Sequence, residues 1–206
     1  MWRSMSATDT YRVKEVFFSL QGEGFHTGKT AVFVRFAGCN LRCPFCDTDF
    51  TGGETVTREA IVRQALAVLP SDVSAERMLL VLTGGEPSLQ ADDALVDALH
   101  EKGFYVAIET NGTHTLPDGI DWITCSPKDA PVVLTRADEL KVVYRGQDVE
   151  PLYDVVEAQH HFLQPCDMSM MPGAPQKDNL QETIAYILTH PRWRLSIQMH
   201  KTANIR

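Results

Sequence analysis

The sequence lacks an excess of basic residues. Its 19 Lys and Arg side chains are outnumbered by 27 Asp and Glu, which gives a formal net charge of −8. Because binding of a phosphate backbone depends on a basic surface, this balance disfavours a nucleic-acid partner and favours a small-molecule substrate. No apolar run reaches the length of a membrane span, and no targeting segment is recognisable. We therefore expect a cytoplasmic protein that does not associate with membranes.

Cysteine is also scarce, and its number is odd. Five Cys residues without a secretory segment do not make a disulfide framework. Three of them, Cys39, Cys43 and Cys46, fall within eight residues directly after an apolar, strand-like run. A closed structural zinc site takes four protein ligands, so three thiolates in one loop predict a metal centre with an open position. A zinc site completed by Cys125, Cys166 or one of the seven His is the alternative that the spacing leaves open.

The chain length and the hydrophobic pattern predict one α/β domain. The 206 residues, 44% of them hydrophobic, suffice for a single domain over residues 1–206, with residues 1–10 as an N-terminal extension. The runs that predict strands are Ala31–Phe36, Met78–Thr83, Phe104–Glu109, Trp122–Cys125, Leu140–Tyr144, His161–Gln164 and Arg194–Gln198. The runs that predict helices are Thr57–Leu69, Leu95–Lys102, Val149–Ala158 and Asp178–Thr189. Alternating strands and helices imply a parallel sheet, which we expect to be a partial barrel with abbreviated helices.

Polar segments follow four of the predicted strands. They are Thr83–Glu86, Glu109–Gly112, Cys125–Lys128 and Gln164–Asp167. Taken singly, each is equally well explained as a turn or a helix cap. Because the carboxyl ends of parallel strands share one edge of a sheet, four in succession predict an active site there.

Two motifs carry a family resemblance. The cysteine loop reads Cys-x3-Cys-x2-Cys with the aromatic Phe45 before the last Cys, and Gly84-Gly85-Glu86-Pro87 follows a predicted strand. Together they resemble the radical S-adenosylmethionine (SAM) superfamily. The resemblance implies a partial (β/α)6-type barrel in which three thiolates, soft ligands suited to iron, hold a 4Fe-4S cluster. It further implies that the fourth iron binds SAM, whose reductive cleavage gives a 5′-deoxyadenosyl radical.

Several longer sequence stretches resemble one family within this superfamily. They are Phe17–Gly24, Val32–Leu41, Cys46–Thr48, Ser126–Lys128, Gln164–Pro165 and Trp193–Lys201. These stretches are similar to the family of 7-carboxy-7-deazaguanine synthases over nearly the whole chain, although Met199 stands where many relatives have Thr. The resemblance implies an ammonia-releasing lyase that contracts the ring of 6-carboxy-5,6,7,8-tetrahydropterin, in the synthesis of queuosine and related 7-deazapurines. It also implies SAM as a regenerated cofactor, Mg²⁺, a flavodoxin or ferredoxin as electron donor, and a homodimer.

The same resemblance assigns site residues. Those expected at the pterin substrate are Leu20, Gln21, Gly22, Glu23, Arg35, Thr83, Glu109, His200 and Arg206, the last through its main-chain carboxylate. Those expected at SAM and the cluster are Phe45, Cys46, Asp47, Gly84, Gly85, Glu86, Ser126, Pro127, Lys128, Gln164, Pro165, Cys166 and Asp167. Cys39, Cys43 and Cys46 are the expected cluster ligands, and Thr48 is the expected Mg²⁺ ligand. Glu109 and His200 are the candidate catalytic residues.

The chemistry of several assigned side chains agrees with these roles, and each also has a simpler explanation. Arg35 has the planar fork that pairs with a carboxylate in bidentate fashion, or it forms a surface salt bridge. Gln21 and Glu23 match the donors and acceptors of a pterin ring, or they lie in a solvated loop. Cys125 and Cys166 are expected to be small buried hydrophobes. The rival functions are another small radical enzyme with a different heterocyclic substrate, and a non-catalytic zinc module.

Overall fold

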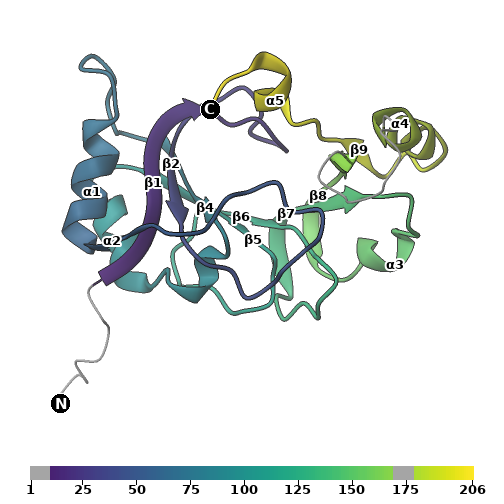
Figure 1. Ribbon diagram of the computed structural model, residues 1–206, viewed down its shortest axis with the longest axis horizontal. Helices are drawn as coiled ribbons and strands as arrows, with labels where there is room; N and C mark the ends of the chain where they lie inside the picture. Colours follow the sequence, from purple (N-terminus) through teal and green to yellow (C-terminus); the bar gives the residue numbers. More distant parts are fainter. Residues whose placement is uncertain (1–9, 169–178) are drawn as a thin grey trace.

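The computed structural model describes residues 10–168 and 179–206, and its strands form one curved sheet (Figure 1). The strands are β1 (Thr10–Leu20), β2 (Thr30–Phe36), β3 (Glu54–Thr57), β4 (Leu79–Gly84), β5 (Tyr105–Thr110), β6 (Trp122–Cys125), β7 (Arg136–Tyr144), β8 (Glu157–Pro165) and β9 (Arg194–Leu195). Their order in the nine-stranded sheet is β3-β1-β2-β4-β5-β6-β7-β8-β9. Strands β2 and β4 to β9 pair in parallel, whereas β1 is antiparallel to both β2 and β3. The sheet curves without closing, which confirms the predicted partial barrel.

Two of the helices begin after a short polar side chain that caps them. Helix α1 (Arg58–Ala67) follows Thr57, whose hydroxyl accepts the N–H of Ala60 at 3.2 Å. Helix α2 (Asp93–His100) follows Asp92, whose carboxylate accepts the N–H of Leu95 at 2.9 Å. Such caps satisfy backbone donors that the first turn leaves free. The remaining helices are the 3-10 turn Pro87–Leu89, α3 (Glu150–Tyr153), α4 (Asn179–Thr189) and α5 (Met199–Ala203).

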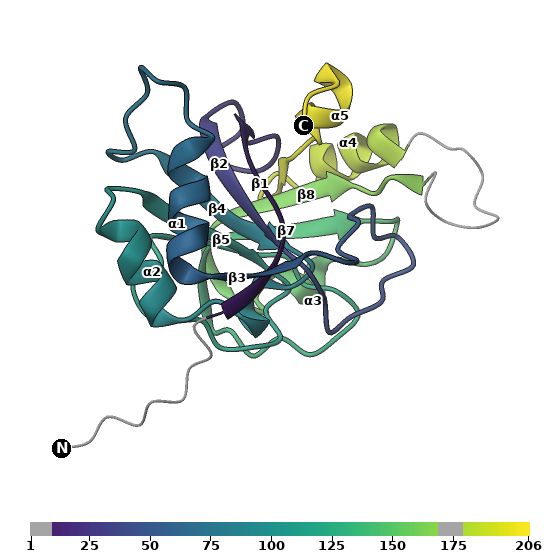
Figure 2. The same cartoon turned by 60° about the vertical axis from the view of Figure 1, so that its left-hand side comes forward.

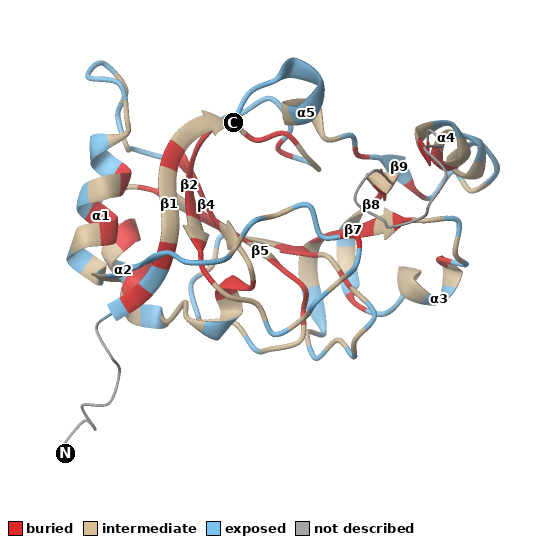
Figure 3. Cartoon of the chain, viewed as in Figure 1, coloured by how far each residue is buried: buried red, intermediate tan, exposed pale blue. Residues whose placement is uncertain are grey.

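The alternation of side chains along each strand separates a packed outer face from a polar inner face. Leu80 and Leu82 of β4 belong to the main hydrophobic core, together with buried side chains of α1 and α2. Helices α1 and α2 cover that outer face, and the central strands are buried (Figures 2 and 3). Val81 and Thr83, on the opposite face of β4, point inward. The outer face therefore holds the fold together, and the inner face is available for a site.

Two predicted elements differ from the structure, and a third begins at a residue that the structure does not describe. Residues 149–158 do not form one helix, because α3 ends at Tyr153 and β8 begins at Glu157. The ladder between β7 and β8, which pairs Arg136 with Glu157, takes up the backbone groups that a continued helix would need. Strand β9 is limited to Arg194–Leu195, so the predicted strand to residue 198 is too long. Asp178, the first residue of the last predicted helix, lies outside the described residues.

Other elements were absent from the prediction. Strand β1, helix α5 and all of β3 except Thr57 lie outside the predicted runs. In β1 the charged residues interrupt the apolar pattern that would have indicated a strand. Of the expected N-terminal extension, residues 1–9 lie outside the described residues and Thr10 is the first residue of β1. Within residues 10–168 and 179–206, no helix has both the length and the apolar character of a membrane span.

Candidate active site

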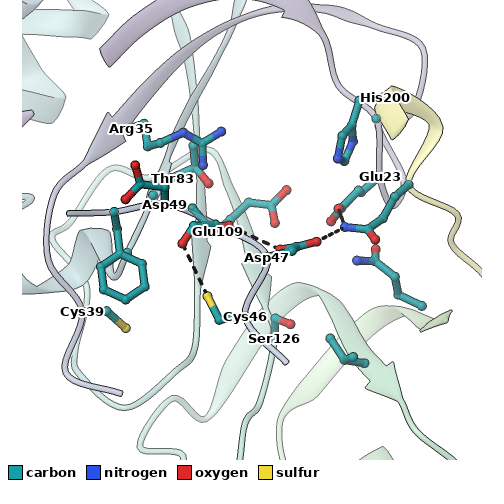
Figure 4. Close-up of a pocket in the computed structure, with 18 of the residues that line it drawn as sticks. Glu23, Arg35, Cys39, Cys46, Asp47, Asp49, Thr83, Glu109, Ser126 and His200 are labelled. Atoms are coloured by element: carbon teal, nitrogen blue, oxygen red, sulfur yellow. Dashed lines mark hydrogen bonds between the residues drawn. The ribbon is translucent and has the colours of Figure 1, made fainter. Parts of the chain in front are cut away.

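The inner face of the sheet surrounds a cavity of about 600 Å³. This volume lies within the range of about 300–1,000 Å³ that is usual for small-molecule sites. All the side chains that the sequence assigned to substrate, cofactor or metal line this cavity, except Pro127. Part or all of each of the four polar strand-end segments contributes, whereas Gly112 and Cys125 do not. Figure 4 shows how the labelled side chains gather around the same hollow.

The cysteine loop forms one wall of the cavity. Cys39, Cys43 and Cys46 are free thiols that line it. The loop turns through a hydrogen bond from the Cys46 N–H to the Cys43 carbonyl at 3.1 Å, and the Leu41 N–H donates to the Cys39 Sγ at 3.3 Å. Burial raises the pKa of the Cys39 and Cys43 thiols. A bound metal deprotonates such thiols, so three of them on one cavity wall fit the thiolate donor set of an iron–sulfur cluster.

Phe45 supports the cysteine loop from within the protein. Its ring is buried, and the guanidinium of Arg145 lies 4.3 Å from the ring centroid. Arg145 in turn pairs with Asp129 at 2.8 Å. A cation over an aromatic face is attracted by the ring quadrupole, so this stack anchors the loop.

The Gly84–Glu86 turn brings the end of β4 against the cysteine loop. The Gly85 N–H donates to the Phe36 carbonyl at 3.1 Å, and the Glu86 N–H donates to the Gly38 carbonyl at 2.9 Å. A Cβ added to Gly85 would lie 1.8 Å from the Gly38 carbonyl oxygen. Only glycine permits this approach of two backbones.

The Glu86 carboxylate already has protein partners. It is buried and accepts the N–H of Ser88 at 3.0 Å, the hydroxyl of Thr110 at 2.6 Å and the N–H of Asn111 at 2.7 Å. These three bonds tie the turn after β4 to the end of β5. A carboxylate has about four acceptor positions, so little capacity remains for a ligand. The three hydrogen bonds give Glu86 a structural role, and its expected contact with SAM stays a prediction.

Gly85→Ala is expected to lower both stability and cluster content. The new Cβ would meet backbone atoms of Gly38, which cannot rotate away. Such overpacking costs about 1–3 kcal/mol, and we expect it to displace the cysteine loop. Urea unfolding and iron content after anaerobic reconstitution measure the two effects. Gly146→Ala is the control for a strained glycine away from the loop. Its φ is 89°, so alanine is disfavoured there as well, but a Cβ at that exposed position meets no atom within 4 Å. Equal iron loss in both variants would contradict the prediction.

A buried lysine holds two carboxylates in the floor of the cavity. The Nζ of Lys141 donates to Glu23 Oε2 and to Glu109 Oε2, each at 2.7 Å. The Gln21 amide donates to Glu109 Oε1 at 3.0 Å, and the Gln198 amide donates to Glu23 Oε1 at 3.0 Å. Burial acts to raise the pKa of Glu23, but the charge and hydrogen bond of Lys141 outweigh it and lower the pKa to about 2. Glu23 is therefore held ionised, and the hydrogen bonds fix the orientations of both carboxylates.

Arg35 and Arg206 share one carboxylate at the edge of the cavity. The Nε of Arg35 donates to Glu15 Oε1 at 2.9 Å, and the Arg206 guanidinium contacts Glu15 Oε2. The carbonyl oxygen of Arg206 accepts the Ser19 hydroxyl at 2.7 Å. Arg35 thus forms the salt bridge that the sequence left as an alternative while it also lines the cavity. A guanidinium has five N–H donors, so this pair leaves donors for a ligand carboxylate.

The C-terminal tail fastens the cysteine loop to the far side of the barrel. Lys201 donates to Asp47 at 2.6 Å and to Asp167 at 2.8 Å, and Gln198 donates to Asp47 at 2.8 Å. Burial opposes ionisation of Asp47, but these hydrogen bonds lower its pKa. The ring of His200 lies so close to Gly22 that a Cβ there would be 2.4 Å from Nδ1. The tail therefore closes one side of the cavity.

Thr48 follows the cysteine loop and lines the cavity beside two aspartates. Its hydroxyl donates to Asp47 Oδ1 at 3.5 Å, and Asp49 pairs with Lys14 at 2.8 Å. Among the described residues, no group of three or more His, Cys, Asp or Glu side chains lies close enough to hold a single metal ion. The assignment of Thr48 to Mg²⁺ stays a prediction.

The remaining predicted residues line the carboxyl ends of β6 and β8. Lys128 is half-buried and donates to the Ser126 hydroxyl at 2.6 Å, and its partial burial lowers its pKa. The Gln164 side chain accepts the Ser196 hydroxyl at 3.1 Å. Cys125 and Cys166 are both buried, as expected for small apolar side chains, and burial raises the pKa of Cys125 to about 12.

Several lining residues were not predicted from the sequence. They are Lys14, Glu15, Asp49, Lys141, Gln198 and Lys201, among others. The sequence could have indicated Lys141, because a lysine inside the apolar run of β7 needs a buried partner of opposite charge. The others lie on β1, in the cysteine loop or in the tail, where no apolar pattern marks an inward position.

Comparisons with known proteins agree on one superfamily. The sequence model of the Radical SAM superfamily matches residues 33–184. A 7-carboxy-7-deazaguanine synthase of Bacteroides thetaiotaomicron is 49% identical over 196 residues, which cover 95% of this chain and 98% of the relative. The synthase of Caulobacter vibrioides is 46% identical over 209 residues, covering 93% and 97%. The crystal structure of QueE from Escherichia coli matches with a TM-score of 0.71 and 30% identity, over 93% of this chain and 95% of that chain.

Proposed function

This chain belongs to the radical SAM superfamily and, within it, to the family of 7-carboxy-7-deazaguanine synthases, and from that premise we propose that it contracts the ring of 6-carboxy-5,6,7,8-tetrahydropterin. The product is 7-carboxy-7-deazaguanine, a precursor of queuosine and related nucleosides, and the nitrogen leaves as ammonia. The enzyme is thus an ammonia-releasing lyase. The matched range 33–184 contains both the cysteine loop and the Gly84–Glu86 turn, which a structural zinc module leaves without a role.

One observation carries the proposal. A single cavity has three free thiols on one wall and the Glu23–Lys141–Glu109 triad in its floor. When bound at the cysteine loop, the 4Fe-4S cluster and SAM supply a 5′-deoxyadenosyl radical. The floor supplies recognition, because ionised carboxylates accept hydrogen bonds from the amino-pyrimidinone edge of a pterin.

Other side chains of the cavity are proposed to bind different parts of the substrate. Arg35 suits the pterin carboxylate, since a guanidinium matches two carboxylate oxygens. The side-chain amide of Gln21 donates to Glu109, and its side-chain oxygen Oε1 accepts the N–H of Glu23 at 3.1 Å. The second bond orders the turn that carries both Gln21 and Glu23. His200 closes the cavity from the tail. These groups orient the ring and exclude water from it.

We also propose the following partners for this reaction. A flavodoxin or ferredoxin donates the electron, two copies of the chain form a homodimer, and neither nucleic acid nor membrane takes part. The reducing cytoplasm suits the thiolate ligands. The net charge of −8 supports the absence of a nucleic-acid partner.

The test is product formation by the reconstituted enzyme. Anaerobically purified protein is loaded with iron and sulfide and incubated with 6-carboxytetrahydropterin, SAM, Mg²⁺ and dithionite. We expect 7-carboxy-7-deazaguanine with one ammonia for each product molecule, while SAM is regenerated. SAM cleavage without this product would keep the radical chemistry and overturn the substrate. A colourless zinc protein would overturn both.

Mg²⁺ is proposed as a further cofactor, bound through Thr48 and oxygen atoms of the substrate and water. A hard cation prefers oxygen ligands, and Thr48 lines the same cavity as Asp47 and Asp49. Thr48→Val is expected to raise the Mg²⁺ concentration for half-maximal activity by at least about tenfold. Thr51→Val is the control, because the Thr51 hydroxyl bonds Asp49 at 2.6 Å and does not line the cavity. Unchanged Mg²⁺ dependence in Thr48→Val would remove the assignment.

A further inference from the structure

A second, much smaller cavity lies directly below the floor of the first. Its volume is about 10 Å³, and it shares Gln21, Glu23 and Glu109 with the large cavity. It lies one step nearer the amino ends of the strands, because Val81, Ala107 and Glu139 each stand two residues before a residue of the large cavity, namely Thr83, Glu109 and Lys141. The remaining lining residues are His26, Trp122 and Thr124.

Two buried side chains on this small cavity have unsatisfied polar atoms. Within the described part of the chain, both ring nitrogens of His26 and the Oε1 of Glu139 are buried without a hydrogen-bond partner. Their side chains belong to residues that are 7% and 2% exposed. Native proteins rarely leave such atoms unpaired, because a buried polar atom that has lost water and gained no partner is destabilising. A missing partner is therefore indicated at this place.

The size and the chemistry of the cavity identify that partner. One buried water needs about 10–15 Å³ and usually makes about three hydrogen bonds. Gln21, Glu23 and Glu109 already form hydrogen bonds in the floor of the large cavity. The other polar groups that line the small cavity and can bond a water are His26, Glu139 Oε1 and the Thr124 hydroxyl. Thr124 accepts a hydrogen bond from Trp122 Nε1 at 3.2 Å, so its own proton is available to donate. The surroundings of His26 are aromatic, and they leave no room for a larger ligand.

We propose that this cavity holds one ordered water molecule bonded to His26, Thr124 and Glu139, and that Glu139, so fixed, is a positioning residue for Lys141 in the floor of the active site. Glu139 and Lys141 lie two residues apart on the same face of β7. The other oxygen of Glu139 accepts the Phe25 N–H at 3.0 Å, which fixes the turn that carries Gln21 and Glu23. The inference rests on the proposed function only for its ligand-binding test.

The protonation state of Glu139 affects how Lys141 pairs with Glu23 and Glu109 in the floor of the large cavity, because all three carboxylates lie near the same lysine. Lys141 is one cation facing Glu23 and Glu109, so an ionised Glu139 would add a third carboxylate to the same lysine. Burial raises the pKa of Glu139 to about 7, against the smaller opposing effect of Lys141. The groups that face the pair are Lys141, Glu109 and Glu23 around Glu139, and Lys29, Asp138 and His160 around His26. With Glu139 protonated, Lys141 stays with Glu23 and Glu109.

The first test is structural and needs no ligand. A high-resolution crystal structure is expected to show one water within hydrogen-bond distance of His26 and Glu139, and His26→Phe is expected to abolish it. An infrared band of a protonated carboxyl should titrate near pH 7 in the wild type and be missing in Glu139→Gln. A dry cavity, or a Glu139 that is ionised at pH 6, would overturn the inference. Both measurements on the wild type remain decisive if a variant fails to fold.

The second test separates positioning from a merely structural role. The dissociation constant of 6-carboxypterin is measured from pH 6 to pH 9 in the wild type and in Glu139→Gln. If the ligand binds only when Glu139 is protonated, the constant rises by up to about tenfold for each pH unit above the titration midpoint. The curve is expected to be flatter in Glu139→Gln, and identical curves would overturn the positioning role. Absence of pterin binding at every pH would instead contradict the proposed function, and the structural test would still decide this inference.

Discussion

Cys43→Ser is expected to abolish both the iron–sulfur cluster and the cleavage of SAM. A serine oxygen is a harder ligand than a thiolate and suits iron in such a cluster poorly. Loss of a supporting side chain around a metal site already costs about 10–100-fold, so loss of a ligand should cost at least about 100-fold in activity. Iron and sulfide content, visible absorbance and 5′-deoxyadenosine formation measure the effect.

Cys125→Ala is the matched control for the cluster prediction. Cys125 is fully buried and does not line the cavity, although it lies in one of the polar segments at the strand ends. The variant should lose some stability through the small void that it creates, but it should keep its iron and its activity. Retention of a full cluster in Cys43→Ser, or its loss in Cys125→Ala, would contradict the assignment of the ligands.

Lys141→Met is expected to have the largest effect on stability. The lysine side chain is 3% exposed, and the side chains of Glu23 and Glu109 are 16% and 21% exposed. Removal of the lysine leaves two largely buried carboxylates without their counter-ion. Breaking a buried pair in this way costs about 3–5 kcal/mol, which is a large part of the stability of a typical domain. Urea unfolding at pH 7 measures the loss.

Two further variants separate this effect from a general sensitivity of β7. Arg136→Met lies on the same strand and breaks the exposed pair with Glu157, whose two side chains are 78% and 73% exposed. It should change the stability by no more than about 1 kcal/mol. The triple variant Lys141→Met with Glu23→Gln and Glu109→Gln removes the unpaired charges and should recover most of the lost stability. An equal loss of stability in Lys141→Met and Arg136→Met would contradict the stabilising role of the buried Lys141 pairs.

The acid side of the stability curve provides an independent check. The pKa of Glu23 is lowered from 4.5 to about 2 in the folded protein. A lowered acid pKa contributes stability that is fully present above pH 4.5 and is lost as the pH falls through 2. In Lys141→Met the main cause of the lowering is gone, so this part of the acid dependence should disappear. Unfolding curves between pH 2 and pH 6 test it.

The cluster loop and the turn after β4 were predictable because their signal is local. Three cysteines within eight residues and a Gly-Gly-Glu turn after a buried strand depend on spacing along the chain. The central strands were predictable for a similar reason, since an apolar run bounded by turn residues already favours a strand. For β6 the predicted bounds, Trp122–Cys125, agree with the structure.

The roles of single charged residues were harder to predict from the sequence. Glu86 matches the family motif, yet in the structure it accepts hydrogen bonds from Thr110 and Asn111, which are 24 and 25 residues further along the chain. Lys201 joins Asp47 to Asp167 across even longer separations. Such partners depend on how the sheet curves and where the tail crosses it. The failed helix at residues 149–158 has the same origin, because pairing with β7 overrides local helical preference.

By itself the sequence determined the chemistry that this protein can hold: three thiols in one loop, a glycine turn for close backbone approach, and a parallel α/β sheet. Only the tertiary structure decided which charges meet. It placed Lys141 between Glu23 and Glu109, left His26 and Glu139 facing one small cavity, and brought the tail against the cysteine loop. The physical reason is range. Local patterns act over a few residues, whereas ion pairs and cavities form between segments that only the folded chain brings together.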